Sequence, residues 1–442
     1  MSAPTNSGRA LTLGGVPLDR AFAALQELEP NAHACWVYDL DAFEARALRF
    51  RTAFAPLAPL SALALKANAL PALLDRARAA GLGADAGSLG ELEMARASGF
   101  AAGERILNGN GRTREEAEWA AREGVHSVNA DSIEELDLLD RAAADAAAKL
   151  RVALRVNPGI ETPGHRYVAT GGEGAKFGVE AGEALSAWQG RVRWGNLRLD
   201  GVHLHVGSQV VESGPLEEAA GVAFALAAES ERRGAPLALV NLGGGMGVDY
   251  SGAGAEFPLE EHAARLIARV RGLAATQGGG AARAGSAEWV FEPGRWLTAP
   301  IGVLLAEVLW VKRRRGPGGA SRRFVVLGAG MNDLIRPALY HAAHRIVPVV
   351  PRAGAPESAC VVGPVCESAD VFAADLALPP LEPGDLVAIL DAGAYGAAMS
   401  SNYNGRGRLA ELVVSGGRLR RARAGEGPPE LVSRRADDEL EV

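Results

Sequence analysis

Eight short apolar runs of strand type, separated by longer stretches of helical periodicity, follow one another between residues 61 and 292. In the first connecting stretch, Leu70, Leu73, Leu74 and Ala77 recur at the spacing that places apolar side chains on one face of a helix. Strands that alternate with helices indicate a parallel sheet, and eight of them predict a closed (β/α)8 barrel of TIM type. A doubly wound open sheet is the alternative. The eight runs are 61–67, 82–85, 106–108, 126–129, 152–156, 201–206, 237–242 and 289–292.

The pattern changes after about residue 300. Strand-type runs then follow one another without long helices between them, which predicts a β-sandwich or β-barrel domain. These runs are 324–327, 360–365, 386–390 and 409–414, and the run 34–38 near the N-terminus has the same character. We therefore expect an α/β barrel plus a β domain. Residues 1–45 would contribute to the β domain, residues 46–300 would form the barrel, and residues 301–442 would form the C-terminal β domain.

Composition favours an enzyme that acts on a small molecule. The 442 residues carry a formal net charge of −7, which provides no basic surface for nucleic acid or an anionic membrane. No apolar stretch approaches the roughly 18 residues that span a bilayer, and residues 1–19 lack the pattern of a signal peptide. Three cysteines without metal-ligand spacing exclude a disulfide framework and fit a reducing compartment. We expect a cytoplasmic protein.

Chemistry in such a barrel lies where the strands end. Lys66, one of only four lysines in an arginine-rich chain, ends the first run. An amine in an apolar setting loses its proton more readily, which suits a Schiff base with an aldehyde cofactor. An ion pair with Asp85, at the end of the second run, explains the lysine equally well.

The seventh and eighth runs end in Gly243-Gly244-Gly245 and in Glu292-Pro293-Gly294-Arg295. Consecutive glycines let backbone N–H groups approach an anion, and the loops after strands seven and eight are the usual phosphate site. A tight turn is the simpler alternative. A carboxylate such as Glu292 keeps a pyridine nitrogen protonated, and an arginine such as Arg295 binds phosphate or carboxylate. Taken alone, these residues favour an internal Glu–Arg ion pair at the barrel rim.

His203 and His205 share one face of the sixth run. Such a pair is typical of a metal-dependent hydrolase, in which Lys66 would bridge the metal. The other histidines supply no further ligand at a strand end, so we expect no metal. A flat imidazole stacked on a cofactor ring, with Ser208 reaching its phosphate, is the preferred interpretation.

The predicted β domain also carries candidate residues. Cys366 and Glu367 place a thiol next to an acid. A cysteine flanked by valine, however, is usually a small buried side chain of the core. Tyr395 lies in a glycine-containing turn that could contact phosphate. Arg336 and Tyr340 share one face if helical and would hold a carboxylate, a surface arginine being the commoner explanation.

Together these segments, in order from Trp36 to Glu411, resemble the fold-type III pyridoxal-phosphate-dependent decarboxylases, and among them the members that act on meso-2,6-diaminopimelate. The resemblance implies an alanine racemase-like fold, pyridoxal 5'-phosphate as cofactor, and formation of L-lysine and CO2. A same-fold decarboxylase of ornithine, arginine, a D-amino acid or a carrier-bound substrate is the alternative, and a non-catalytic relative is a further one. The segments are 64–68, 176–178, 203–209, 243–245, 292–295, 336–340, 366–368 and 391–403.

The resemblance also implies residue roles. Lys66 would form the Schiff base, His205 would stack on the ring and Glu292 would pair with its nitrogen. The implied cofactor-binding set is Lys66, Asp85, His205, Ser208, Gly243, Gly244, Gly245, Glu292, Gly294, Arg295 and Tyr395. The implied substrate-binding set is Arg295, Arg336, Tyr340, Glu367 and Tyr395. The active form would be a head-to-tail homodimer with shared sites, in which the partner chain supplies Cys366, as proton donor, and Glu367.

One segment departs from the family pattern. After Tyr403-Asn404 the family usually has a serine-arginine-proline stretch, whereas this chain has Gly405-Arg406-Gly407-Arg408. The departure touches no residue assigned above, but it leaves room for a change at the dimer edge or in the substrate.

Overall fold

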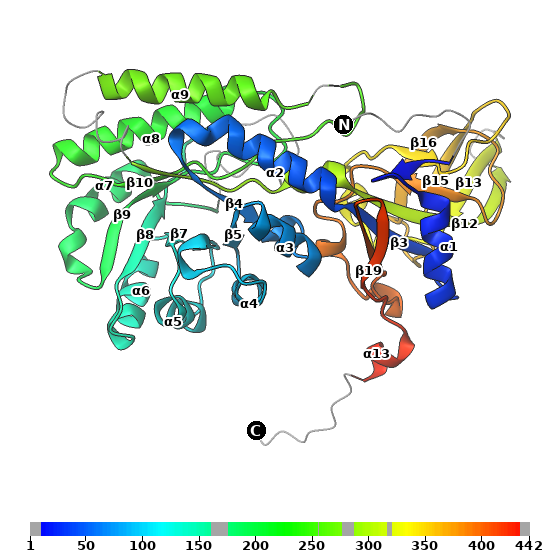
Figure 1. The fold of residues 1–442 in the computed structure, drawn as a ribbon, viewed down its shortest axis with the longest axis horizontal. Helices are drawn as coiled ribbons and strands as arrows, with labels where there is room; N and C mark the ends of the chain where they lie inside the picture. The colour runs from blue at the N-terminus through cyan, green and yellow to red at the C-terminus, as the bar shows by residue number, and fades with distance from the viewer. Residues whose placement is uncertain (1–9, 161–175, 255, 276–286, 316–320, 434–442) are drawn as a thin grey trace. The chain divides into compact units, whose positions relative to one another are not determined.

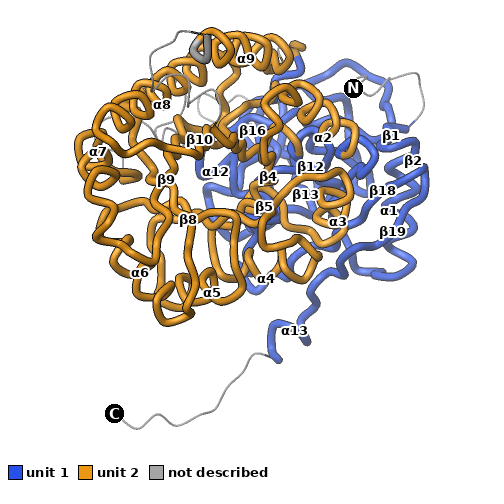
Figure 2. The backbone as a smooth tube through the Cα atoms, turned by 60° about the vertical axis from the view of Figure 1, so that its left-hand side comes forward, with its two compact units in different colours: residues 1–43, 250–252, 298–442 blue, residues 44–249, 253–297 orange. Residues whose placement is uncertain are grey.

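The computed structural model describes residues 10–160, 176–254, 256–275, 287–315 and 321–433. The chain divides into two compact units (Figures 1 and 2). The barrel unit comprises residues 44–249 and 253–297, and the sheet unit comprises residues 1–43, 250–252 and 298–442.

In the barrel unit, eight parallel strands of the described chain close in the order β10-β11-β4-β5-β6-β7-β8-β9. The closed (β/α)8 barrel is therefore confirmed, and the open-sheet alternative is wrong. The strands are β4 (Leu60–Ala64), β5 (Gly83–Ala86), β6 (Arg105–Leu107), β7 (Ser127–Ala130), β8 (Leu150–Arg155), β9 (Leu197–His203), β10 (Leu239–Asn241) and β11 (Glu288–Phe291).

Helices connect successive strands around the outside of the barrel (Figure 1). The one after β4 has the predicted apolar face, since Leu73, Leu74 and Ala77 are its buried residues. The interior is a packed core rather than a pore, filled by side chains such as Ala62, Ile106 and Val290. The helices are α2 (Leu40–Phe54), which leads into β4, then α3 (Pro71–Ala79), α4 (Leu89–Ala97), α5 (Arg114–Glu123), α6 (Glu134–Asp145), α7 (Ala181–Gln189), α8 (Gly214–Arg232) and α9 (Leu259–Ala275).

The described part of the sheet unit forms a nine-stranded, mostly antiparallel sheet in which the N-terminal strand β3 lies between β12 and β18. Its central path runs β16-β15-β13-β12-β3-β18-β19, and β17 pairs with both β12 and β14. The strands are β3 (Ala34–Asp39), β12 (Gly302–Arg315), β13 (Ser321–Leu327), β14 (Ile346–Pro348), β15 (Glu357–Val362), β16 (Val371–Leu378), β17 (Leu386–Ile389), β18 (Glu411–Ser415) and β19 (Arg418–Arg423). The predicted β domain is thus a mixed sheet with short helices.

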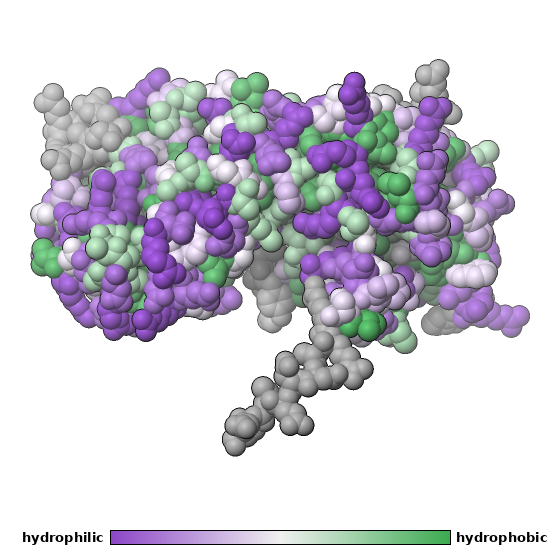
Figure 3. Space-filling view, turned by 60° about the horizontal axis from the view of Figure 1, so that its bottom comes forward, coloured by the Kyte–Doolittle hydropathy of each residue, from purple (hydrophilic) through white to green (hydrophobic). Residues whose placement is uncertain are grey.

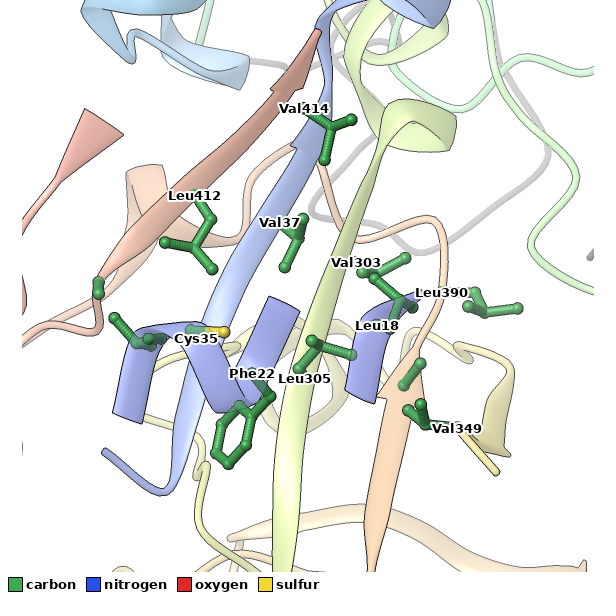
Figure 4. Packing of buried hydrophobic residues seen from close by; sticks show 13 residues of the cluster. Leu18, Phe22, Cys35, Val37, Val303, Leu305, Val349, Leu390, Leu412 and Val414 are labelled. Atoms are coloured by element: carbon green, nitrogen blue, oxygen red, sulfur yellow. The ribbon is translucent and has the colours of Figure 1, made fainter. Parts of the chain in front are cut away.

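One helix covers a face of this sheet. Helix α1 (Leu18–Leu28) turns Leu18 and Phe22 toward Cys35, Val37 and Leu305 of the central strands (Figure 4). These side chains are nearly inaccessible to solvent, and burying each large apolar one contributes roughly 1.5–3 kcal/mol. The remaining elements are the two-residue strands β1 (Thr12–Leu13) and β2 (Val16–Pro17) and the short helices α11 (Arg295–Thr298), α12 (Arg336–Tyr340) and α13 (Pro428–Val432).

Hydrophilic residues predominate on the face drawn in Figure 3, with small hydrophobic areas among them. No helix within the described ranges is both long and apolar enough to cross a membrane.

Candidate active site

A cavity of about 360 Å³ lies at the carboxyl ends of the barrel strands. Its walls come from the ends of β4, β5, β6, β8, β9 and β11 and from the loops that follow them. Four of the predicted site residues line the cavity: Lys66, Asp85, His205 and Glu292. The lining residues are Lys66, Asp85, Gly87, Ser88, Glu91, Asn108, Gly109, Asn110, Arg155, Phe177, His203, His205 and Glu292.

Lys66 lies just beyond its strand rather than in it. Strand β4 ends at Ala64, and a single 3-10 turn, Leu65–Ala67, carries the lysine to the edge of the cavity. Leu65 and Ala67 are buried on either side. The apolar neighbours therefore fix the backbone while the amine faces the polar cavity.

Glu292 is held by three amides. The Nδ2 groups of Asn108, Asn129 and Asn241 all donate to its Oε1, at 2.9, 2.9 and 2.6 Å. Its Oε2 lies 3.5 Å from Nε2 of His203, a side chain that is itself buried. Burial alone would raise the pKa of Glu292, but the imidazole of His203 and the amide hydrogen bonds lower it below its usual range. Glu292 is therefore a carboxylate at neutral pH.

Asp85 differs from Glu292 in that its pKa is raised rather than lowered. It is also buried, and Asn108 Nδ2 donates to its Oδ1 at 2.5 Å, so one amide bridges the two acids. Burial and the nearby charge of Glu292 raise the pKa of Asp85 well above its usual value, although Lys66 acts in the other direction. Two carboxyl groups in one cavity thus favour different protonation states, an arrangement that recurs at catalytic sites.

His205 is held neutral. Burial, together with the positive charges of Lys66 and Arg155, keeps the pKa of His205 well below its usual value. Its Nδ1 accepts a hydrogen bond from the Gly244 N–H at 3.3 Å, which places the ring proton on Nε2. A flat, uncharged imidazole is suited to lie against an aromatic ring.

The three glycines are needed for close packing of their loop. A Cβ on Gly244 would lie 2.2 Å from the carbonyl oxygen of Glu292, and one on Gly245 would lie 2.6 Å from that of Gly207. Gly243 has a φ of +62° and would meet the carbonyl of Leu204 at 2.7 Å. The loop therefore lies directly against the segments that carry Glu292 and His205.

A buried cation lies beside Ser208. Arg295 donates to Ser208 Oγ from Nη2 at 2.9 Å and from Nε at 3.3 Å, and the arginine is buried. A buried guanidinium with a hydroxyl beside it is a strong site for phosphate oxygens. An ion pair between Glu292 and Arg295 does not by itself explain these two side chains. Glu292 accepts amide hydrogen bonds, and Arg295 donates to Ser208.

These groups fit pyridoxal phosphate. An ionised carboxylate suits a protonated ring nitrogen, a neutral imidazole suits the ring face, and Arg295 with Ser208 suits the phosphate. Lys66 supplies the amine for the aldehyde.

The two histidines make separate contacts. His203 faces Glu292 and His205 accepts from Gly244. Within the described segments, no group of three or more His, Cys, Asp or Glu side chains is arranged to hold a metal ion.

Five predicted site residues lie in the sheet unit. Arg336 begins α12 and is buried, with its guanidinium 4.5 Å from the ring centroid of Tyr250 and Nη1 2.7 Å from Nε2 of His344. The surface-arginine explanation is therefore wrong. Tyr340 ends the same helix, and Tyr395 adopts a left-handed φ of +56°.

Cys366 and Glu367 are both exposed in the single chain. The expectation of a buried filler cysteine is therefore wrong, because Cys366 lies in a loop after β15 and only Cys35 and Cys360 are buried.

Sequence reasoning missed the residues that surround Glu292. Asn108, Asn129 and Asn241 each lie at the end of a barrel strand, which was the available signal. For His203 the sequence predicts a role only as a metal ligand.

The comparisons with known proteins agree with this geometry. The model of the pyridoxal-dependent decarboxylase family, pyridoxal binding domain, matches residues 40–299. The diaminopimelate decarboxylase of Zymomonas mobilis is 38% identical over 385 residues, covering 86% of this chain and 87% of that protein. The structure of diaminopimelate decarboxylase from Helicobacter pylori complexed with L-lysine superposes with a TM-score of 0.84 at 33% identity, covering 93% of this chain and 98% of that one. The chain therefore belongs to the family of pyridoxal-dependent decarboxylases that contains the diaminopimelate decarboxylases.

Proposed function

We propose that the protein decarboxylates meso-2,6-diaminopimelate to L-lysine and CO2, with pyridoxal phosphate held in the barrel cavity. The observation that carries the proposal is the placing of Lys66 and an ionised, buried Glu292 in the wall of one cavity. The identity to diaminopimelate decarboxylases over most of the chain supports the choice of substrate.

The cofactor, when bound, supplies a sink for the electron pair that remains when the α-carboxylate leaves as CO2. Glu292 would hold the proton at the ring nitrogen, because a carboxylate with a lowered pKa stabilises a cation beside it. Lys66 would provide the amine that holds the aldehyde of the bound cofactor. His205 would pack against the ring without adding a charge.

Ser208, Arg295 and the loop of Gly243–Gly245 would hold the phosphate. Arg295 adds a buried positive charge, and the glycines let the backbone approach. We assign Tyr395 to the same phosphate.

Selectivity would come from the far end of the substrate, at Arg336, Tyr340 and Glu367. A buried guanidinium attracts the second carboxylate of diaminopimelate, whereas the terminal ammonium of lysine or ornithine would meet a like charge. Cys366 would return a proton to the carbon that has lost CO2.

The experiment is release of CO2 by the cofactor-loaded protein offered meso-diaminopimelate, ornithine, lysine and arginine separately. We expect release from diaminopimelate alone, with lysine as product. Release only from another amino acid would overturn the substrate, and release from none would overturn catalysis by this chain.

We further infer that the active form is a homodimer with shared sites. A proton donor works from a position shielded from bulk water, and the exposure of Cys366 and Glu367 in the single chain is consistent with a partner that covers them.

Mixing two inactive variants tests this inference. Lys66→Ala and Cys366→Ala subunits, refolded together at equal amounts, would form hybrids with one intact site, giving about one quarter of wild-type activity. No recovery would show that both residues act within one chain.

The free state of all three cysteines also supports a cytoplasmic location. Fractionation of cells that express the tagged protein would test this.

A further inference from the structure

The loop of residues 363–370, called here the cysteine loop, is held by two side chains, one at its own end and one from a separate segment. The Val365 N–H donates to Oδ2 of Asp370 at 2.7 Å. The next N–H along the chain, that of Cys366, donates to Oδ1 of Asn404 at 2.9 Å. Two successive peptide groups are thus held, one on each side of the Val365 Cα, and they set the direction in which the Cys366 side chain leaves the loop.

Asp370 is the first of the two side chains that hold the cysteine loop. It is buried, and its second oxygen accepts the Met331 N–H at 2.7 Å, so one carboxylate ties the cysteine loop to the segment before α12. The space around it is full, since a Cβ on Gly363 would lie 2.3 Å from Oδ2 of Asp370. The carboxylate therefore cannot shift without moving the loop.

Asn404 is the second side chain that holds the cysteine loop, and it lies in a tight turn at residues 402–407. Asn404 and Gly405 both adopt left-handed backbone conformations, with φ of +58° and +65°. Asn402 Nδ2 closes the turn by donating to the Arg406 carbonyl at 3.1 Å and to Glu426 Oε2 at 2.7 Å.

Gly407 is the residue that lets this turn pack. A Cβ at Gly407 would lie 1.8 Å from the carbonyl oxygen of Glu426, so no other residue fits without movement of the backbone. This turn includes most of the segment in which the chain departs from the family pattern, Gly405-Arg406-Gly407-Arg408.

We propose that the turn at 402–407 and Asp370 are positioning elements for the thiol of Cys366, with Asn404 fixing the peptide that carries the thiol. The proposal rests on the role of Cys366 as proton donor in the proposed function. In that step the S–H bond breaks as a C–H bond forms at the carbon that has lost CO2, and the thiolate regains a proton from water.

The departure from the family pattern at Gly405–Arg408 is then explained by the packing of this turn, without a change of substrate. This segment completes the turn from which Asn404 accepts the Cys366 N–H. A thiol fixed in direction delivers its proton to one face of the reacting carbon, whereas water reaches both faces.

The test uses the holoenzyme with variants Asn404→Ala, which removes the acceptor, and Asn404→Asp, which keeps it. Each variant is assayed in deuterated water. The readouts are kcat, KM for meso-diaminopimelate, and the configuration of the deuterium at the ε-carbon of the lysine formed. Asn196→Ala, which removes an amide hydrogen bond to Asp140 in the barrel unit, is the matched control.

We expect Asn404→Ala to lower kcat by roughly tenfold to hundredfold, as small misplacements of a catalytic group do, with KM changed less than about twofold. Its product should carry deuterium in both configurations. The wild type, Asn196→Ala and Asn404→Asp should give a single configuration. Asn404→Asp also tests the contact should Asn404→Ala not fold, because loss of configuration with the acceptor retained would overturn the proposal.

Cys366→Ala separates this inference from the proposed function. If that variant keeps the wild-type kcat and a single configuration, the donor role of Cys366 fails, and the positioning proposal with it. If Cys366→Ala loses both while Asn404→Ala keeps both, the donor role stands and the positioning proposal alone is overturned.

Discussion

Substitution of Asn129 measures how much one amide hydrogen bond stabilises the ionised form of Glu292. Asn129 is buried, and its Nδ2 donates to Glu292 Oε1 and to Asn108 Oδ1, both at 2.9 Å. Its own Oδ1 accepts no hydrogen bond in the structure. Asn129→Leu keeps the size and branching of the side chain and removes the donor to both Glu292 and Asn108; the loss at Asn108 also occurs in the Glu292→Gln control background.

The expected magnitude follows from the charge on the acceptor. A hydrogen bond to a charged group contributes about 1.5–3 kcal/mol, and one pKa unit corresponds to about 1.36 kcal/mol. The variant should therefore raise the pKa of Glu292 by about one to two units and lower the free energy of unfolding by about 1.5–3 kcal/mol.

The sign of the pH dependence is also fixed. Because the pKa of Glu292 is lowered on folding, its stabilising contribution is present above the unfolded value and is lost as the pH falls through the native value. The difference between wild type and variant should therefore stay constant from pH 8 down to about pH 5, and narrow only below the raised pKa of the variant.

Calorimetry of the cofactor-free protein measures this loss. For a unit of this size each kcal/mol shifts the melting temperature by about 2–4 °C, so the barrel transition should fall by about 3–12 °C. Repeating the substitution in a Glu292→Gln background is the control, where the neutral acceptor leaves a loss of only about 0.5–1.5 kcal/mol. Equal losses in the two backgrounds, or a loss that varies between pH 5 and 8, would refute the reasoning.

Three further predictions concern the lysine, the distal arginine and a buried acid of the sheet unit. Lys66→Ala should lose both turnover and the visible absorption band of the bound cofactor, and an unchanged spectrum would contradict its role. Arg336→Ala should raise KM for diaminopimelate by about tenfold to a hundredfold, the loss of a charged hydrogen bond, while cofactor affinity stays within about twofold; an equal loss of both would contradict a substrate role. Burial, with the charge of Asp370, raises the pKa of Asp333 to about 7, so the sheet unit should lose about 3 kcal/mol of stability as the pH rises from 4 to 7. Asp333→Asn should flatten that slope in pH-dependent melting curves, and a variant with the wild-type slope would show that another group titrates.

The barrel could be predicted because each of its strands is short, apolar and followed by a separate helical period. The ends of those strands then gave Lys66, Asp85, His205 and Glu292 as candidates without any knowledge of their contacts. Buried arginines are harder, since Arg336 has the local sequence of a surface residue and its burial depends on Tyr250 and residues of the same unit far along the chain.

The amides around Glu292 could not be predicted for a different reason. Asn108, Asn129 and Asn241 each resemble ordinary residues at a strand end, where asparagine favours turns. Only closure of the barrel brings the ends of β6, β7 and β10 within reach of one oxygen atom. A single-residue shift in the register of any of these strands would turn its asparagine out of the barrel.

The neighbours of each acid, rather than the type of acid, decide which of Glu292 and Asp85 is charged. Glu292 receives three amide hydrogen bonds and faces His203, whereas Asp85 receives one amide hydrogen bond, from Asn108. Both are buried, so desolvation raises the pKa of each, and only for Glu292 do His203 and the amide hydrogen bonds together reverse that effect. The charge of Glu292 then raises the pKa of Asp85 further, so ionisation of the first acid suppresses ionisation of the second. The barrel strands thus concentrate one negative charge at the position where a protonated ring nitrogen would be bound, and this polarity is set by the protein before any cofactor enters.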